Sequence, residues 1–195
     1  MFTGIVETIG IVNEIIPNGS NKTFWIESAL ASEFKVDQSV SHDGVCLTVE
    51  ETKGNLHRVT AIEETLQKTI LDFWEAGKKI NLERCLPLNG RLDGHFVQGH
   101  VDTTGTCRKR EEKAGSLEFE FEFPKKFAEL VIEKGSICIN GISLTAFRVK
   151  KKSFCVAIVP YTLEHTNIKD IKPDKAVNLE FDVIGKYILR KITMA

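Results

Sequence analysis

The clearest pattern along the chain is the alternation of charged and aromatic residues in one short segment. Residues 117–123 read LEFEFEF, so every second side chain is apolar. Successive side chains of a β-strand point to opposite faces, so this period of two predicts a strand with one face in a core and the other in water. Other short runs rich in β-branched residues predict strands at 4–14, 22–27, 45–52, 56–62 and 79–84.

Helical spacing is confined to a few places. Pro124 opens PKKFAELVIEKG, in which the spacing of Phe127, Leu130 and Val131 before Gly135 predicts one short helix, with SALASEF as its counterpart earlier in the chain. Residues 183–195 carry apolar side chains along one stripe and predict an amphipathic helix. That stripe would either fold back on its own domain or join its equivalents in an oligomer.

The same strand-rich pattern occurs twice. SVSHDGVCLTV (residues 39–49) matches SICINGISLTA 97 residues further on, and the same offset relates ETLQKT to YTLEHT. GIVETIG near the start matches GHVDTTG at an offset of 95. A register kept across several turns indicates two copies of one unit. We call the part up to Cys85 copy one and the part from His95 copy two, joined by LPLNGRLDG.

Short strands separated by turns, with few helices, predict an all-β fold. Closure of each copy into a barrel removes the exposed edge strands of an open sheet, which so small a unit could not otherwise cover. We therefore expect two tandem homologous antiparallel barrels, at 1–88 and 89–184, each with short helices. A C-terminal helix over 185–195 would follow, as an oligomerisation element if its stripe joins those of other subunits.

Composition narrows the function classes. The 195 residues have a formal net charge of −1, which argues against a nucleic-acid partner. We expect no membrane association, because no stretch approaches the roughly 18 apolar residues of a span, and a cytoplasmic location, because no basic region precedes the apolar N-terminus. The five cysteines form no CxxC motif or Cys/His cluster, which indicates free thiols in a reducing compartment and no metal site.

Candidate chemistry lies in the duplicated turn motifs. DGVCLTV and NGISLTA place Cys46 beside Thr48 and Ser143 beside Thr145 on one face of a strand. If that face looks inward, each pair offers hydrogen-bond donors and acceptors to a ring rich in heteroatoms; otherwise it is a layer of small residues. The exchange of Cys46 for Ser143 suggests that the two copies have different tasks.

Histidines are the candidate proton carriers. His95 and His100 flank one glycine turn in GHFVQGH, where copy one has none, whereas His42, His57 and His165 are expected at the surface. Asp182 could accept hydrogen bonds from hydroxyl groups or simply cap a helix. Lys134 could hold an anion or a carbonyl, or only stand at a solvated helix end. No GxGxxG, GxxxxGK[ST] or GxSxG motif occurs.

Taken together, MFTGIVE, DGVCLTV, ETLQKT, GHFVQGHVD, NGISLTA and YTLEHT resemble the riboflavin synthase α-chain family over essentially the whole chain. The resemblance implies two six-stranded Greek-key barrels in a homotrimer joined by the C-terminal helix. It implies a transferase that moves a four-carbon unit between two molecules of 6,7-dimethyl-8-ribityllumazine, giving riboflavin and 5-amino-6-(D-ribitylamino)uracil. No cofactor is implied, and an association with lumazine synthase is left open.

The resemblance also implies roles for particular residues. Ser143, Cys46, His100 and Thr145 would be catalytic, with Ser143 or Cys46 assisting addition at C7 of a lumazine and His100 carrying a proton. One lumazine would lie among Phe2, Thr3, Gly4, Ser39, Cys46, Thr48 and Ile62. The other would lie among His100, Val101, Lys134, Ser143, Thr145, Val159, Thr162 and Asp182.

A non-catalytic antenna protein that binds one lumazine or flavin in its first copy is the alternative function. Such a relative is expected to lose the ligand-binding side chains of its second copy. Because Ser143, Thr145, His100 and Asp182 are all present here, the enzyme is the favoured interpretation.

Overall fold

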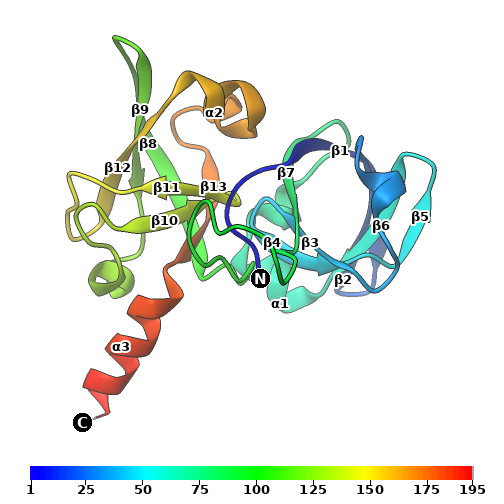
Figure 1. Cartoon of the computed structure of the whole chain (residues 1–195), viewed down its shortest axis with the longest axis horizontal. Coiled ribbons are helices and arrows are strands. Elements are labelled where there is room, and N and C mark those ends of the chain that lie inside the picture. Colours follow the sequence, from blue (N-terminus) through cyan, green and yellow to red (C-terminus); the bar gives the residue numbers. More distant parts are fainter. Residues whose placement is uncertain (195) are drawn as a thin grey trace.

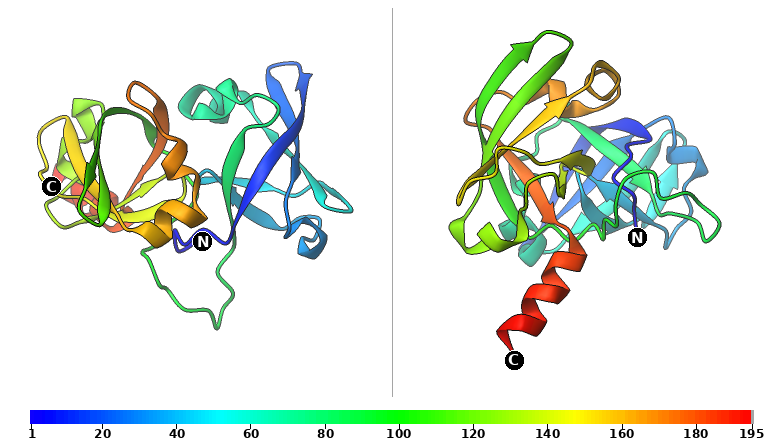
Figure 2. Two further views of the ribbon diagram at one scale, coloured as in Figure 1. Left: turned by 90° about the horizontal axis from the view of Figure 1, so that it is seen from above. Right: turned by 60° about the vertical axis from the view of Figure 1, so that its left-hand side comes forward.

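Two curled β-sheets side by side make up the body of the protein, and one helix projects from it (Figure 1). The structure is a computed structural model that describes residues 1–194. Copy one forms the first sheet and copy two the second. Figure 2 shows the connection between them as a long loop on the outside of the molecule.

All neighbouring strands in both sheets are antiparallel. The order in copy one is β4-β3-β7-β1-β2-β6-β5, and in copy two it is β11-β10-β13-β8-β9-β12. The strands of copy one are β1 (Thr8–Asn18), β2 (Asn21–Glu27), β3 (Ser39–His42), β4 (Val45–Thr48), β5 (Glu51–Lys53), β6 (Leu56–Ala61) and β7 (Lys79–Arg84). Those of copy two are β8 (Thr103–Lys113), β9 (Ser116–Glu122), β10 (Ser136–Ile139), β11 (Ile142–Thr145), β12 (Ser153–Ile158) and β13 (Ala176–Phe181).

Each sheet closes on itself through the strand that follows the glycine turn. In copy one β5 continues the path of β4 and pairs with β6, and in copy two Phe147 pairs with Cys155 of β12. Strands β3, β4–β5 and β6 are therefore successive neighbours, and β7 returns beside β3, which is the Greek-key order. The expected pair of six-stranded Greek-key barrels is confirmed, with β4 and β5 forming one bent strand.

Local irregularities repeat between the copies as well. The pairing of β1 with β2 shifts register between Val12 and Glu14, and that of β8 with β9 shifts between Cys107 and Lys109. These bulges lie 95 residues apart, which is the offset of the first sequence block. A bulge bends and twists its strand, so the two barrels curve at the same place.

The helices are short except for the last one. They are α1 (Glu63–Lys68), α2 (Pro160–His165) and α3 (Val183–Thr193), together with the 3-10 helices η1 (Ala31–Glu33), η2 (Ile70–Phe73), η3 (Lys125–Leu130) and η4 (Asn167–Asp170). The predicted helix after Pro124 is thus a 3-10 helix. Helices α1 and α2 were missed because six residues show no periodicity, although acidic residues at the start of α1 and Pro160 at the start of α2 are typical of helix N-termini.

The core of the second barrel confirms the alternating pattern. Phe119 and Phe121 of β9, with the following Phe123, are buried against Phe154 and Phe181, while the glutamates between them face outward. Ring centroids of adjacent phenylalanines lie 5.7 to 6.0 Å apart for Phe121–Phe154, Phe123–Phe154 and Phe123–Phe181. None of the helices among the described residues is long and apolar enough to cross a membrane.

The interior of the first barrel contains a pair of histidines, so the expectation that His42 and His57 lie at the surface is wrong. Their Nε2 atoms are 2.9 Å apart, and Nδ1 of His42 lies 2.9 Å from the Val40 carbonyl oxygen. The corresponding residues of copy two, 97 positions on, are Ile139 and Phe154. Burial lowers the pKa of both imidazoles, to about 4 for His57 and well below the usual value for His42. His165 is exposed, as expected.

A buried polar network joins the two barrels around an approximate two-fold axis. The side-chain amide of Asn81 donates to the Asn140 carbonyl oxygen (2.8 Å), and that of Asn178 donates to the Asp43 carbonyl oxygen (2.9 Å). The symmetry is broken by Asn167, whose side chain also donates to Oδ1 of Asp43 at 2.7 Å. Because every one of these groups is buried, the bonds fix how the barrels sit against each other.

Asp43 is the one carboxylate in this network. Its Oδ1 accepts from Asn81 N and from Asn167, while its Oδ2 has no hydrogen-bond partner. Burial raises the pKa of Asp43 to about 7. Its counterpart Asn140 occupies the same turn position with nearly the same φ, 46° against 47°.

Acid should destabilise the first barrel through its histidine pair. The folded-state pKa of His57 lies below the usual 6.5, so the unfolded chain binds protons first and stability falls as the pH drops from 6.5 towards 4. His57 alone accounts for roughly 3 kcal/mol of this loss. We expect the H42I/H57F variant, which carries the copy-two residues, to lose less stability in acid than the wild type. The free energy of urea unfolding at neutral pH and at about pH 4.5 measures the loss. An equal acid-induced loss in both proteins would contradict the assignment.

Asp43 should act in the opposite direction. A carboxyl whose folded-state pKa is raised loses stability as the pH rises from its unfolded value of 3.8 to about 7. We expect Asp43→Asn to preserve both hydrogen bonds to Oδ1 and to stabilise the protein above pH 7 by up to about 4 kcal/mol. Thermal unfolding of the two proteins at several pH values measures the effect, and Asp37→Asn, on an exposed turn, is the control. No gain in stability at pH 8 would show that burial does not raise the pKa of Asp43 in the folded state.

Candidate functional site

The first residues of each copy cross over to the other barrel. The carbonyl oxygen of Gly4 accepts from Ser143 N in copy two at 2.7 Å, and that of Gly99 accepts from Cys46 N in copy one at 2.8 Å. We call residues 2–5 and 97–100 the crossing segments. They pair with each other where Phe2 N donates to the Val97 oxygen (2.7 Å) and Val97 N donates to the Phe2 oxygen (3.1 Å). The strand expected over 4–14 therefore begins only at Thr8, and the first strand of copy two begins at Thr103.

Glycine is required at both crossing points. Gly4 and Gly99 have φ values of +76° and +78°, a conformation that favours glycine. A Cβ atom at Gly4 would lie 2.6 Å from Cβ of Ser143, and one at Gly99 would lie 2.6 Å from Cβ of Cys46. Any side chain here would push the segment away from the residue it covers.

The candidate side chains lie on the outer wall of each barrel. Val45 and Leu47 of β4 point into the core, so Cys46 and Thr48 between them point outward. Ser143 and Thr145 alternate with core residues of β11 in the same way. The face that could have looked inward is thus outside the barrel, where it lies beneath the crossing segment of the other copy.

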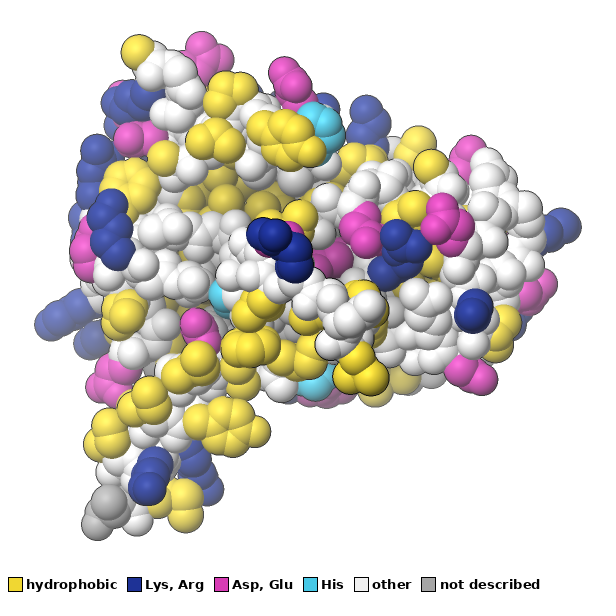
Figure 3. Space-filling view, in the orientation of Figure 1, with side chains coloured by type: hydrophobic (Ala, Val, Ile, Leu, Met, Phe, Trp, Pro, Cys, Tyr) yellow, Lys and Arg dark blue, Asp and Glu magenta, His cyan; other side chains and the backbone are white. Residues whose placement is uncertain are grey.

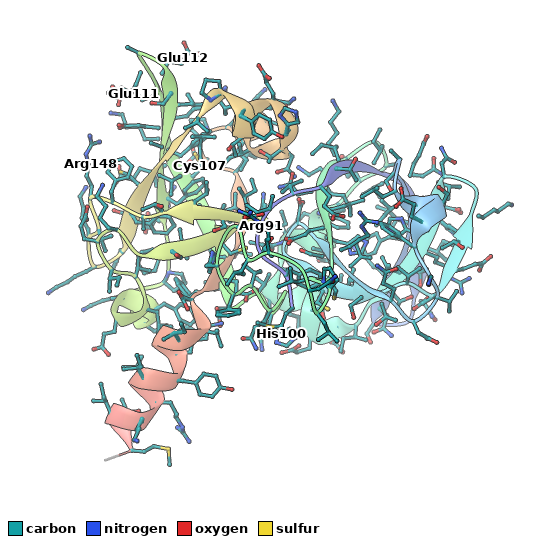
Figure 4. The ribbon with its side chains drawn as sticks, viewed as in Figure 1. Arg91, His100, Cys107, Glu111, Glu112 and Arg148 are labelled. Atoms are coloured by element: carbon teal, nitrogen blue, oxygen red, sulfur yellow. The ribbon has the colours of Figure 1, made fainter. Side chains whose placement is uncertain are left out.

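A cavity of about 420 Å³ lies beside Cys46. His100 is part of its lining, at the junction of the two barrels (Figure 4), and a Lys186–Asp102 ion pair with an N–O distance of 2.6 Å lies at its edge. The structure places His100 and Val101 beside Cys46 of copy one, and not beside the copy-two residues with which the resemblance groups them. The full lining is Val45, Cys46, Glu64, Thr65, Lys68, Thr69, Gly99, His100, Val101, Asp102 and Lys186.

The other predicted copy-one residues extend this surface. Ser39 is directly opposite Thr48 in the β3–β4 ladder, and its side chain partly offsets the effect of burial on the pKa of the Cys46 thiol. Burial raises the pKa of that thiol, so it is protonated at neutral pH. Ile62 immediately precedes α1 and is exposed. Cys46, Thr48, Ser39 and Ile62 thus lie on or next to one outward surface.

In copy two, Ser143 contacts a histidine. Nδ1 of His95 lies 2.7 Å from Oγ of Ser143, and His95 is buried, with an exposed fraction of 8%. Burial lowers the pKa of His95, while the nearby carboxylate of Asp182 opposes that shift. A neutral imidazole in contact with a hydroxyl group can take up its proton, which makes His95 the histidine placed to act on Ser143.

The crossing segment from the N-terminus completes this arrangement. Phe2 is fully buried and Thr3 nearly so, and the carbonyl oxygen of Thr3 accepts from His95 N at 3.1 Å. The resemblance assigns Phe2, Thr3 and Gly4 to the lumazine of copy one. In the structure, Gly4 instead covers Ser143 of copy two, and Thr3 contacts His95. The two crossing segments have thus exchanged their expected sites.

The remaining predicted residues of copy two surround this surface less closely. Asp182 caps α3, its Oδ1 accepting from Ile184 N at 2.9 Å, so the capping alternative is confirmed. Lys134 has a φ of 63° and its Nζ lies 5.6 Å from the centroid of the Phe147 ring. Val159, at the start of α2, is exposed, and Thr162 lies within the same helix.

One lining residue of the copy-one cavity could have been found from the repeat. Thr65 is the counterpart of Thr162, which the resemblance assigns to the other pocket, whereas Lys68 is the counterpart of His165, which was expected only at the surface. His95 and Ser143 were both candidates from the sequence, but their contact was not predicted, because it depends on the crossing of the segments.

A family model described as "Lumazine binding domain" matches the chain twice, at residues 3–85 and 98–182. Among solved structures, LumP in complex with riboflavin has a TM-score of 0.85 at 24% identity, covering 93% of this chain and 99% of LumP. LumP in complex with 6,7-dimethyl-8-(1'-D-ribityl) lumazine gives a TM-score of 0.84 at 22% identity. These structures share the two-barrel fold.

Curated relatives cover nearly the whole chain. The riboflavin synthase of Bacillus amyloliquefaciens is 35% identical over 97% of this chain and 89% of its own length. That of Actinobacillus pleuropneumoniae is 36% identical over 96% of this chain and 88% of its own, and that of Saccharomyces cerevisiae is 34% identical over the full chain and 87% of its own. With both lumazine-binding domains matched in register, the chain belongs to the riboflavin synthase family.

Proposed function

We propose that the protein converts two molecules of 6,7-dimethyl-8-ribityllumazine into riboflavin and 5-amino-6-(D-ribitylamino)uracil. A four-carbon unit passes from one lumazine to the other, and the atoms balance without an external oxidant or reductant. The observation that supports this most directly is a pair of related but unequal sites, with Cys46 beside His100 in copy one and Ser143 bonded to His95 in copy two. Two identical substrates with opposite roles need such a pair.

In the proposed reaction one lumazine loses a proton from its C7 methyl group, and the other is attacked at C7. His95 and Ser143 form the proton-transfer pair of copy two, in place of the role first given to His100. His100 and the neutral thiol of Cys46 serve the lumazine bound at copy one. Thr48 and Thr145, on the same strands, polarise the rings. Holding both rings together supplies much of the rate by proximity.

No cofactor is part of this proposal. The substrate ring itself delocalises the negative charge that forms when the C7 methyl group loses its proton. What the protein supplies is positioning, a proton acceptor and hydrogen-bond donors towards the ring heteroatoms.

We further propose a homotrimer that joins copy one of one subunit to copy two of the next. Ile184, Tyr187, Ile188 and Ile192 of α3 are between 54% and 75% exposed, so residues 1–194 cover little of the apolar stripe of this helix (Figure 3). Exposed Ile62 and Val159 likewise leave the two site surfaces open. Helix association and closure of the sites by a neighbour would bury all of these side chains.

The proposed division of the chain follows from these features. Residues 1–88 and 89–184 would each form one lumazine-binding unit, exchanging their crossing segments, and 185–195 would be the oligomerisation element. A cytoplasmic location is part of the proposal and is supported by the five cysteines, all of which have free thiols.

The antenna role is the weaker alternative. The LumP structures share the fold, but the sequence relatives at 34% to 36% identity are riboflavin synthases. The intact Ser143–His95 contact in copy two also favours turnover over passive binding.

Incubation of the purified protein with 6,7-dimethyl-8-ribityllumazine alone tests the proposal. We expect riboflavin to form in a ratio of one molecule for every two lumazines consumed, followed by absorbance and fluorescence. A bound, fluorescent lumazine that is never converted would instead support the antenna role.

Ser143→Ala and His95→Asn should each lower kcat by about 10²-fold or more, because proton transfer by a positioned pair contributes at least that much. The double variant should be little worse than either single one, since the two residues act as a unit. Ser39→Ala, at the edge of the copy-one surface, is the control and should lower kcat far less. The acid limb of the wild-type pH profile should lie below pH 6.5, because burial lowers the pKa of His95, and it should vanish in His95→Asn. Equal, mild effects of all three substitutions would contradict the assigned pair.

A further inference from the structure

Two buried glutamates occupy equivalent positions in the two barrels. Glu83 lies in β7 and Glu180 in β13, 97 residues apart, and their exposed fractions are 5% and 2%. Neither carboxylate forms an ion pair in the described part of the chain, and Lys186, whose charge acts on Glu180, pairs with Asp102. Burying a carboxylate is costly unless hydrogen bonds compensate for the lost water.

Both carboxylates find that compensation in the crossing segments. Glu180 accepts from Gln98 N through Oε1 (2.6 Å) and from His100 N through Oε2 (2.9 Å). Glu83 accepts from Thr3 N through Oε1 (2.6 Å) and from Gly4 N through Oε2 (3.0 Å). Each carboxylate therefore binds two main-chain amides, one with each oxygen, which is a bond pattern that only a group with two acceptors and no donor can provide.

The segment that each glutamate holds faces the opposite barrel. Glu180 belongs to copy two, but the segment it binds presents His100 and the Gly99 oxygen to Cys46 of copy one. Glu83 belongs to copy one, but it binds Thr3, and the Thr3 oxygen in turn accepts from His95 N. His95 then contacts Ser143 of copy two. A series of contacts thus leads from Glu83 to the hydroxyl group of Ser143, and from Glu180 to the main-chain amide of Cys46.

We propose that Glu83 and Glu180 are positioning residues of the reaction, and that each controls the site carried by the opposite barrel. This inference rests on the proposed function for its kinetic consequence, but its structural content concerns ligand binding at the two surfaces. Glu83 fixes His95 and Gly4 against Ser143, and Glu180 fixes His100 and Gly99 against Cys46. The two barrels thereby become dependent on each other for a working site.

The substitutions Glu83→Gln and Glu180→Gln test the proposal at nearly constant volume. Glutamine keeps one acceptor oxygen but turns an NH2 group towards the second main-chain N–H, so one of the two amide bonds is lost. Glu14→Gln is the matched control, since Glu14 is exposed on β1. Thermal unfolding shows whether each variant is folded, and amide hydrogen exchange at Thr3, Gly4, Gln98 and His100 shows directly which segment has been released.

Riboflavin binding is the readout that does not require turnover. Titration of isotope-labelled full-length protein, followed through the amide signals of Cys46–Thr48 and Ser143–Thr145, reports the two surfaces separately. We expect Glu180→Gln to weaken binding at the copy-one signals by about tenfold or more and to leave the copy-two signals close to wild type. Glu83→Gln should give the reverse result, and Glu14→Gln should change neither.

Kinetics with 6,7-dimethyl-8-ribityllumazine provide the second readout. The His95-dependent acid limb of kcat should shift in Glu83→Gln but keep its wild-type position in Glu180→Gln, whose effect should appear mainly in KM.

Equal weakening of both surfaces by each variant, or weakening at the glutamate's own barrel, would overturn the crossed assignment. If a glutamine variant does not fold, Glu83→Asp and Glu180→Asp take its place, because they withdraw the carboxylate by one methylene. Unchanged hydrogen exchange at the bound amides in these variants would overturn the crossed assignment equally. Absence of turnover in the wild type, with crossed binding effects intact, would reject only the proposed function.

Discussion

The pairing of the two crossing segments is the constraint on which the rest of the structure depends. Phe2 and Val97 exchange two main-chain hydrogen bonds between the barrels, and both side chains are fully buried. From this point each segment runs outward to cover a strand of the other copy, where a glycine carbonyl receives the amide of Cys46 or Ser143. Burial of main-chain groups without such partners would be costly, so each barrel needs the other one to satisfy its own backbone.

The buried polar network between the barrels follows the same two-fold relation but departs from it at a few positions. Asn81 and Asn178 exchange equivalent hydrogen bonds, and Gly44 and Gly141 approach so closely that a Cβ atom on either would lie 2.7 or 2.8 Å from the other turn. Departures from the symmetry among buried residues include Asn167 against Ile70, Asp43 against Asn140, and the histidine pair against Ile139 and Phe154. Since these replacements concentrate buried titratable groups in copy one, the two barrels respond differently to pH although their backbones match.

Much of this architecture could be predicted from the sequence, because it depends on local patterns. The period of two in LEFEFEF, the repeated turn motifs and the apolar stripe of α3 all describe short segments whose structure follows from neighbouring residues. The offset of 97 residues also paired Cys46 with Ser143, and the structure places the amides of both under a glycine carbonyl. The change of offset from 95 to 97 falls between β2 and β3, where the 3-10 helix η3 of copy two is longer than η1 of copy one.

What could not be predicted are contacts between residues far apart in the chain. Nothing local to His100 indicates that it belongs with Cys46, and nothing local to His95 indicates Ser143, because both contacts result from the path of the main chain between the barrels. His42 and His57 were misplaced for a related reason. A histidine in a strand reads as a surface residue unless a second one is known to lie opposite it inside the barrel.

The crossing of the segments has a bearing on how such a protein could arise. A single copy would lack the glycine carbonyl that now accepts from the amide of Cys46 or Ser143. Its own crossing segment would also have no strand of another barrel to cover. Two separate single-barrel chains related by a two-fold axis would meet both needs at once, each lending its leading segment to the other. Fusion of two such genes would keep every one of these contacts. In a pair of identical chains each substitution appears in both barrels, whereas after fusion each half could change alone.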